Sequence, residues 1–297
     1  MRASSIPSPE SSTIYGSTER MCGMTDLADL LAIARAAVAE GADLLSNAAP
    51  GSIDAKADRD FVTELDVEIQ RKVQRYLHAA TPDIGFLGEE SDIGRPVDPG
   101  DGQVWILDPI DGTSNFIHGL PLCAVSLALA CDGRPRVGVI CAPFLGVEFY
   151  AAEGLGAYAG GKRLTTGNAQ QLREAIVSIG DYAVGSEAEA ANHDRLALTQ
   201  SLAAVAERVR MFGSAALDLA WVAEGRIDGC VILSNKPWDM AAGVVIARES
   251  GAMVTDSDGT DHSIRARHTV AANPAISGEL IRLVAESSAR NARVRRA

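Results

Sequence analysis

The chain is short of aromatic residues and of positive charge, and it contains no long apolar run. Aromatic side chains make up 5% of the 297 residues, and 39 Asp and Glu outnumber 27 Lys and Arg, which gives a formal net charge of -12. This charge disfavours binding to nucleic acid or to an anionic membrane. No stretch approaches the roughly 18 apolar residues of a transmembrane helix. The sequence therefore predicts neither nucleic acid nor membrane as a partner.

The chain also lacks a cysteine framework. Its five cysteines are odd in number, and no two of them form a CxxC pair. A disulfide scaffold or a zinc knuckle is therefore disfavoured, and a reducing compartment, the cytoplasm, is expected. Most of the cysteines lie in apolar stretches, which is typical of thiols packed in a core. They are Cys22, Cys123, Cys131, Cys141 and Cys230.

Apolar sequence is abundant enough for a sizeable core. Hydrophobic residues make up 47% of the chain, and its length suggests one large or two moderate domains. Residues 1–23 are rich in Ser, Pro and Thr without the apolar segment of a signal peptide, so we predict a disordered extension. Met24 is a hypothetical alternative start. We expect an N-terminal α+β lobe at 24–166, a C-terminal α/β lobe at 167–289 and a frayed basic tail at 290–297.

Hydrophobic periodicity predicts the elements of a layered α/β protein. Helices are expected at 25–47, where Thr25 can act as the cap, and at 63–79, with a polar loop at 52–60 between them. Strands are expected at 84–87 and 104–107, and then in a β-rich middle that ends in a hairpin turn at 160–162. The second half alternates strands and helices, with helices at 194–207, 214–224, 238–250 and 276–288.

Acidic residues cluster where the predicted strands end. Glu89 follows one strand, Asp108 and Asp111 follow the next, Asp239 begins a helix after a third, and Asp66 lies in the first turn of a helix. An open α/β sheet presents its ligands at such places. Carboxylates gathered in one site repel each other unless a cation is present, and magnesium prefers oxygen ligands. The pattern predicts magnesium ions that bridge this acidic protein to a phosphate and activate water.

Each acid also has a purely structural interpretation. The run Asp108-Pro109-Ile110-Asp111-Gly112-Thr113 is rich in turn formers. Glu89 alone is typical of a solvated surface acid, and Asp239 alone complements a helix dipole. Asp66, three residues after Thr63, is typical of a capping residue. The loop at 54–60 is acidic, but it lacks the spacing of an EF-hand calcium site. These separate explanations weaken when the acids are considered together.

Three segments together resemble the inositol monophosphatase family of magnesium-dependent, lithium-sensitive phosphatases. They are GEES at 88–91, WILDPIDGTSNF at 105–116 and WDMAAG at 238–243. The similarity spans about residues 27 to 284. It implies a layered α-β-α-β-α sandwich, often homodimeric, that hydrolyses a small-molecule phosphate monoester with water activated by metal ions.

The resemblance implies a ligand set for two to three Mg²⁺ ions, with Mn²⁺ as a substitute. Glu89, Asp108 and the backbone carbonyl of Ile110 would hold the first ion. Asp108, Asp111 and Asp239 would hold the second. Glu89 would also reach a third, weaker ion through water, which gives it a catalytic role.

The resemblance also implies groups that handle water and phosphate. Thr113, paired with Asp66, would orient and deprotonate the attacking water. Gly112 and Thr113 would offer backbone N–H groups to the phosphate at a helix N-terminus, which is a good anion site on first principles.

Substrate contacts are less complete. Ser214 and Ala215 match the segment that lines the substrate sugar, and Ser214 also reads as a helix N-cap. Inositol-specific members carry an acid six residues before the second signature's Trp, where this chain has Ile232. Isoleucine cannot accept hydrogen bonds from substrate hydroxyls. Lys236 is more typical of a solvated loop lysine than of a contact to a second phosphate.

Four substrates therefore stay open: inositol 1-phosphate, histidinol phosphate, fructose 1,6-bisphosphate and 3′-phosphoadenosine 5′-phosphate. We favour an inositol-1-phosphate phosphatase of broad specificity, with histidinol phosphate as the runner-up. Some family members act mainly by binding transcription machinery, so a protein-interaction role with vestigial catalysis is the alternative from another class.

Overall fold

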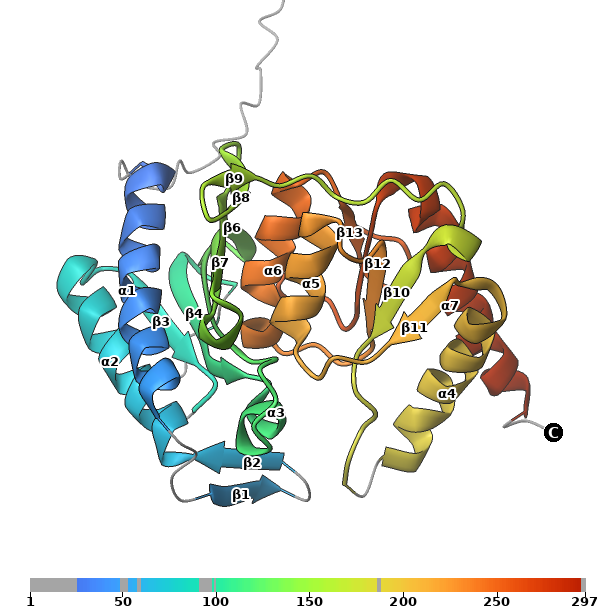
Figure 1. Ribbon diagram of the computed structural model, residues 1–297, viewed down its shortest axis with the longest axis horizontal. Coiled ribbons are helices and arrows are strands. Elements are labelled where there is room, and N and C mark those ends of the chain that lie inside the picture. Colours follow the sequence, from blue (N-terminus) through green and yellow to red (C-terminus); the bar gives the residue numbers. More distant parts are fainter. Residues whose placement is uncertain are drawn as a thin grey trace, which may run out of the picture.

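Two β-sheets alternate with three layers of helices (Figure 1). The computed structural model describes residues 26–48, 53–57, 60–90, 98, 100–185 and 188–294, with the backbone alone at 53–57, 60–62 and 288–294. The predicted extension at 1–23, Met24, Thr25 and the last residues of the predicted tail lie outside the described residues, as does Cys22.

The first half forms a seven-stranded sheet, a two-stranded ribbon and three helices. Their bounds are α1 (Leu27–Asn47), β1 (Ile53–Ala57), β2 (Asp60–Thr63), α2 (Glu64–Ala80), β3 (Gly85–Gly88), β4 (Gln103–Asp111), α3 (Thr113–Ile117), β5 (Ala124–Cys131), β6 (Arg134–Ala142), β7 (Val147–Ala152), β8 (Gly156–Ala159) and β9 (Lys162–Arg163). The seven strands follow the order β3-β4-β5-β6-β7-β8-β9. The β3–β4 pair is parallel and the other pairs are antiparallel.

The second half forms a five-stranded sheet with four helices. Their bounds are β10 (Ile176–Ile179), α4 (Ala188–Val205), β11 (Arg208–Arg210), α5 (Ala215–Glu224), β12 (Gly229–Ile232), α6 (Pro237–Glu249), β13 (Met253–Thr255), β14 (Thr269–Ala272) and α7 (Pro274–Val294). The strand order is β11-β10-β12-β14-β13. Since β10 is parallel to both β11 and β12, these three strands end at the same edge of the sheet.

Side-chain alternation on β5 explains how the first sheet is covered on both faces. Val125, Leu127 and Leu129 pack in the cluster that contains α1 and α2. Ala124, Ala128 and Ala130 point the other way, into the cluster that contains α5 and α6. Successive residues of a strand point to opposite faces, so one strand serves two cores. The smaller alanines face α6, which lies close to the sheet.

A glycine permits this close approach. A Cβ at Gly138 on β6 would lie 2.4 Å from the carbonyl oxygen of Ala242 on α6. Any larger residue there would push α6 away from the first sheet.

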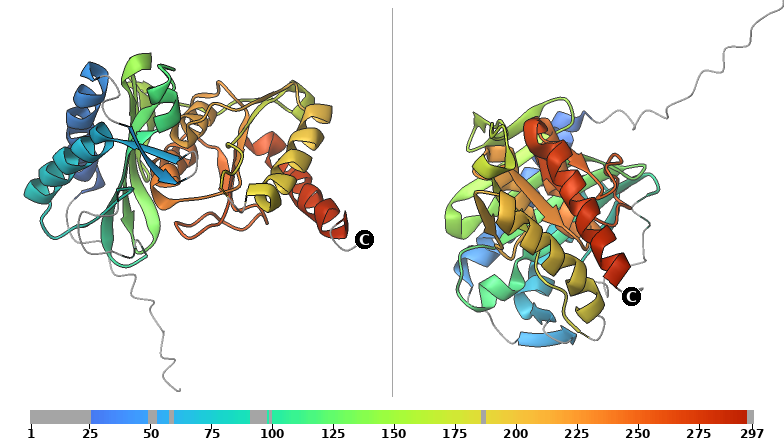
Figure 2. Two further views of the ribbon diagram at one scale, coloured as in Figure 1. Left: turned by 90° about the horizontal axis from the view of Figure 1, so that it is seen from below. Right: turned by 90° about the vertical axis from the view of Figure 1, so that its right-hand side faces the viewer.

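The second sheet is covered in the same way. Cys230 and Ile232 of β12 pack toward α5 and α6, whereas Val231 packs with α4 and α7. The layers are therefore α1/α2, first sheet, α5/α6, second sheet and α4/α7, which confirms the predicted α-β-α-β-α sandwich (Figure 2).

Several predicted elements differ from the observed ones. The stretch at 52–60 contributes to the β1–β2 ribbon and is not the predicted polar loop. The prediction failed because the polarity of this stretch outweighed its short alternating pattern. Helix α4 begins at Ala188 rather than at 194, because its first turns contain good helix formers. The prediction missed these turns because they carry no apolar stripe. Helix α7 continues to Val294, into the predicted tail. Asp26 caps α1, with its carboxylate accepting from the Ala28 N–H.

Strand β4 is also longer than predicted. We expected it to end at Leu107, but it runs to Asp111. Proline lacks the N–H that a ladder needs, and the register accordingly shifts between Asp108 and Asp111 before pairing resumes with Ala124. The hairpin turn predicted at 160–162 is confirmed: Gly160 and Gly161 both have positive φ and join β8 to β9.

Two expectations from composition are met within the described residues. Cys123, Cys131, Cys141 and Cys230 are free thiols, and all except the partly exposed Cys141 are buried. None of the helices in this part of the chain combines the length and the apolarity that a membrane crossing needs.

Candidate active site

The predicted acids of the first sheet come together where β3 and β4 end. The Glu89 N–H donates to the carbonyl of Leu107, which fixes the end of β3 against β4. Asp108 is only 3% exposed. Its Oδ1 accepts from the Ile110 N–H at 3.0 Å, so the carboxylate folds back over the irregular part of β4. Strand pairing and this local turn therefore place Glu89 and Asp108 at one edge.

Asp111 joins the first sheet to the middle helix layer. Its carboxylate accepts from the Ser214 hydroxyl, from the Ala216 N–H at 3.0 Å and from the Ala215 N–H at 3.3 Å. These donors form the first turn of α5, where an acid is stabilised by free N–H groups and by the helix dipole. Asp239, in the first turn of α6, approaches from the same layer.

The carboxylates are close enough to change one another's ionisation. Burial raises the pKa of Asp108 well above its ordinary value, and the charges of Glu89, Asp111, Asp239 and Asp66 raise it further. Burial likewise raises the pKa of Asp111 to about 6, although the bonds from α5 act in the opposite direction. The site concentrates negative charge without a compensating cation among these residues.

This donor set fits a hard divalent cation. It consists of carboxylate oxygens and one carbonyl, the ligands that Mg²⁺ prefers. Within the residues that the structure describes, no three Asp, Glu, His or Cys side chains already surround a single point. The bonds of Asp111 to α5 are one reason, because they direct its oxygens toward the helix. Ligation would need side-chain rotations within a cluster of suitable chemistry.

Asp66 and Thr113 form the second predicted pair. The Thr63 N–H and hydroxyl both donate to Asp66 Oδ2, at 2.8 and 2.5 Å, so the predicted capping role of Asp66 is confirmed. The Thr113 hydroxyl lies 3.4 Å from Asp66 Oδ1 and 2.9 Å from the Ile110 carbonyl oxygen. The Thr113 hydroxyl can therefore donate its proton either to Asp66 or to the Ile110 carbonyl.

Gly112 is required by the backbone at this position. Its φ is +89°, and a Cβ there would lie 2.7 Å from the Leu122 carbonyl oxygen and 3.1 Å from that of Gly213. Asn115 holds the same junction, since its Nδ2 donates to the Phe212 carbonyl at 2.8 Å and also to that of Leu122. Sequence reasoning missed this role of Asn115, although its place in the first signature segment was a signal.

Two of the predicted substrate residues, Ser214 and Ala215, contact Asp111 directly. Ser214 caps α5, as predicted, by accepting from the Leu217 N–H, and Ala215 is partly exposed next to it. Ile232 is only 4% exposed and packs in the central core, so it offers at most an apolar wall. Lys236 is exposed, with its Nζ 5.6 Å from the centre of the Trp238 ring.

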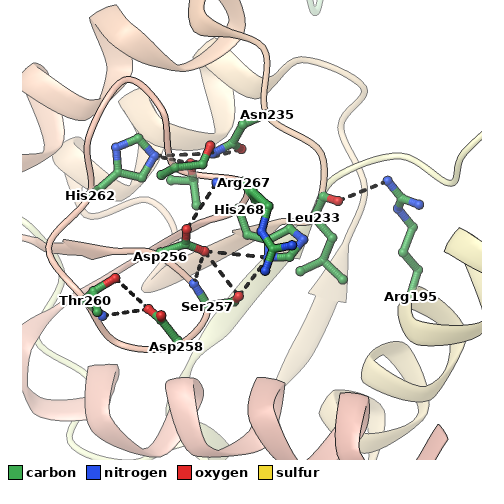
Figure 3. Close-up of polar contacts among 12 residues, drawn as sticks. Arg195, Leu233, Asn235, Asp256, Ser257, Asp258, Thr260, His262, Arg267 and His268 are labelled. Carbon is green, nitrogen blue, oxygen red and sulfur yellow. Dashed lines mark hydrogen bonds and ion pairs between the residues drawn. The ribbon is translucent and has the colours of Figure 1, made fainter. Parts of the chain in front are cut away.

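A polar network not predicted from the sequence supports the β12–α6 connection that leads to Asp239 (Figure 3). The Asn235 N–H donates to the Arg267 carbonyl, and its side chain contacts His262 and Thr269. His262 Nε2 lies 2.7 Å from the Thr269 hydroxyl. Burial, followed by the charge of Arg248, lowers the pKa of His262 to about 4. This neutral, buried network fixes the loop before α6.

Comparisons with known proteins agree with this geometry. Residues 26–289 match the model of the inositol monophosphatase family. The chain is 36% identical to a fructose-1,6-bisphosphatase/inositol-1-monophosphatase of Thermotoga maritima, over 77% of this chain and 84% of that protein. It is 35% identical to a Nus factor SuhB of Pseudomonas aeruginosa, over 75% and 82%. A solved structure of a Thermotoga maritima IMPase superposes with a TM-score of 0.79 at 32% identity, covering 88% of this chain and 99% of that one.

Proposed function

Because the chain belongs to the inositol monophosphatase family, whose members are metal-dependent phosphoric monoester hydrolases of small phosphate esters, we propose that it uses Mg²⁺ to hydrolyse an inositol-1-phosphate-like monoester with broad specificity. The observation that carries this proposal is the buried acidic cluster around Asp108, whose raised pKa marks charge that a cation would neutralise. Glu89, Asp108, the Ile110 carbonyl, Asp111 and Asp239 are the proposed ligands of two to three ions, and Mn²⁺ is expected to substitute.

Bound ions of this kind lower the pKa of water and neutralise charge on the leaving oxygen. The chain's own part is to accept a proton and to orient the phosphate. In the structure the Thr113 hydroxyl favours the Ile110 carbonyl, at 2.9 Å, over Asp66, at 3.4 Å. If that carbonyl becomes a metal ligand, Asp66 is the acceptor that remains. The hydroxyl would then take a proton from the attacking water as it gives its own proton to Asp66, so that Thr113 stays neutral and Asp66 ends protonated.

The phosphate would lie beside Gly112 and Thr113. The left-handed conformation of Gly112 turns the chain sharply between β4 and α3. Backbone N–H groups at such a turn are suited to an anion. The alcohol part of the ester would extend toward Ser214 and Ala215, since α5 begins directly beside Asp111.

The test is phosphate release from the four candidate esters, with Mg²⁺ or Mn²⁺ and with added lithium or EDTA. We expect turnover with Mg²⁺, inhibition by lithium and none in EDTA. Asp108→Asn should abolish turnover without unfolding the protein, whereas Asp83→Asn, which changes an exposed acid in the turn after α2, should change nothing. An active Asp108→Asn enzyme would refute the ligand assignment.

A regulatory role is the second candidate, because one relative is named a Nus factor. This candidate predicts that the folded wild-type chain releases no phosphate from any of these esters. It also predicts that the Asp108→Asn variant retains the cellular role of the wild type. We also propose a homodimer, which analytical ultracentrifugation of the full chain would test.

A further inference from the structure

The ends of β10 and β12 lie next to each other at the edge of the second sheet that meets the acidic cluster. Ile179 pairs with Val231 in parallel, and the Gly180 N–H donates to the Val231 carbonyl at 2.9 Å. The chain after β12 leads to Asp239, and the chain after the neighbouring β11 leads to Ser214, which contacts Asp111. A residue that directly follows β10 therefore leaves the sheet on the side of the proposed substrate.

Gly180 packs directly on Ile232, the residue that replaces the expected acid. A Cβ at Gly180 would lie 3.3 Å from Ile232 Cγ2. The next residue along this strand end is Asp181, which is accessible to solvent although its carboxyl is partly buried. A carboxylate thus stands one residue beyond the apolar contact, just after the neighbouring strand β10.

Asp218 links Asp181 electrostatically to the acidic cluster. Asp218 is buried on α5, one turn after Ser214, to whose carbonyl its N–H donates at 3.0 Å. The charges of both Asp111 and Asp181 act on its carboxyl and help burial to raise its pKa. Both carboxylates therefore lie within electrostatic reach of one group on the first turns of α5.

Asp181 has no protein partner of its own within the described part of the chain, where burial alone raises its pKa. The segment that carries it is nonetheless fixed. The Ala183 N–H donates to Asn192 Oδ1 at 2.6 Å, Asn192 Nδ2 donates back to the Ala183 carbonyl, and the Tyr182 hydroxyl lies 3.1 Å from that of Thr199. An accessible acceptor on a fixed segment is suited to a ligand.

We propose that Asp181 determines substrate specificity by accepting a hydrogen bond from a donor, a hydroxyl or an ammonium group, on the alcohol part of the phosphate ester. The inference rests on the proposed function and deepens it. Asp181 supplies from the segment after β10 the acid that Ile232 cannot supply from β12. The same charge repels a second phosphate at this position, so donor-bearing monoesters are preferred to bisphosphates.

The test compares kcat/KM of Asp181→Asn with that of wild type on four esters. p-Nitrophenyl phosphate carries neither donor nor second phosphate, inositol 1-phosphate carries hydroxyls, histidinol phosphate carries an ammonium group, and fructose 1,6-bisphosphate carries a second phosphate. Asparagine replaces the charged acceptor with a neutral one and so weakens the hydrogen bond, which should lower kcat/KM about 3- to 30-fold on the ester whose donor Asp181 contacts. Activity on p-nitrophenyl phosphate should not change, and activity on the bisphosphate, which bears hydroxyls as well as a second phosphate, should rise relative to that on inositol 1-phosphate because the repulsion is removed.

The two donor arms identify the group. Asparagine keeps an acceptor oxygen but loses the charge, so a larger loss on histidinol phosphate indicates ammonium, and a loss on inositol 1-phosphate indicates hydroxyl. Glu189→Gln, which removes an exposed charge at the start of α4, is the matched control and should behave as wild type.

Failures of the two proposals are distinguishable. If wild type hydrolyses p-nitrophenyl phosphate with Mg²⁺ but Asp181→Asn leaves all ratios between the esters unchanged, the role of Asp181 is wrong while the phosphatase stands. An equal loss on all four esters would also overturn it, because it would indicate a structural role. If wild type hydrolyses none of them, the proposed function is lost and the role of Asp181 with it.

Discussion

Asp111→Asn measures what the acidic cluster costs the protein in the absence of cations. The pKa of Asp111 is raised from 3.8 to about 6, so the folded state binds more protons than the unfolded state between these values. The stability associated with Asp111 is therefore greatest below pH 3.8 and falls as the pH rises to 6. Above that pH, ionising this buried carboxyl costs about 3 kcal/mol. Asparagine has no charge and avoids this cost.

In EDTA at pH 8 we expect Asp111→Asn to be more stable than wild type by about 1–3 kcal/mol, the lower figure allowing for weaker bonds to Ser214 and Ala216. The advantage should disappear near pH 4. Magnesium at roughly a hundred times its Kd should stabilise wild type by about 3 kcal/mol and the variant much less. Urea unfolding, with and without Mg²⁺, measures both differences. A variant that is less stable than wild type in EDTA, or equally stabilised by Mg²⁺, would refute the reasoning.

Three further predictions concern the residues around the cluster. The pKa of His262 is lowered to about 4, so stability should fall by about 3 kcal/mol as the pH drops from 6.5 to 4; urea unfolding of His262→Gln should lack this part of the acid loss. Gly112→Ala, with its Cβ 2.7 Å from a carbonyl oxygen, should lower the Tm more than Gly119→Ala, which has positive φ but open space; equal losses would contradict the close contact. Ser214→Ala should cost about 1 kcal/mol through the lost cap of α5, and an unchanged thermal unfolding curve would show that the cap contributes nothing.

The parts of the fold that the sequence predicts are those with a strong local pattern. The apolar stripe of α1, with Leu30, Ala34 and Val38 buried, and the continuous apolar run of β5 were both recognisable. The first turns of α4 and the ribbon β1–β2 were not, because neither carries an apolar periodicity of sufficient length. The extension of β4 through Pro109 depends on pairing with Ala124, a contact that no local pattern encodes.

The site divides in the same way. Strand ends predicted that Asp108, Asp111 and Asp239 would gather, and their mutual effect on the pKa of Asp108 agrees with that prediction. Their roles as metal ligands stay predictions. The bond from Ser214 to Asp111 and the contacts of Asn115 to Phe212 were beyond reach, because each joins residues about a hundred positions apart.

These long-range contacts suggest why the acids are tolerated at all. Asp111 ends a strand of the first sheet and accepts from the first turn of α5, so the carboxylate that is costly to ionise also joins two layers. Asp239 begins α6, which packs on the first sheet through the Gly138 contact. A cation held by Asp108, Asp111 and Asp239 would connect the same two layers a second time while removing the repulsion. The layer junction would then be weakest without the cation and strongest with it. Metal binding would then offset the free-energy cost of burying the acids, and the affinity for the cation would report how much of that cost is offset.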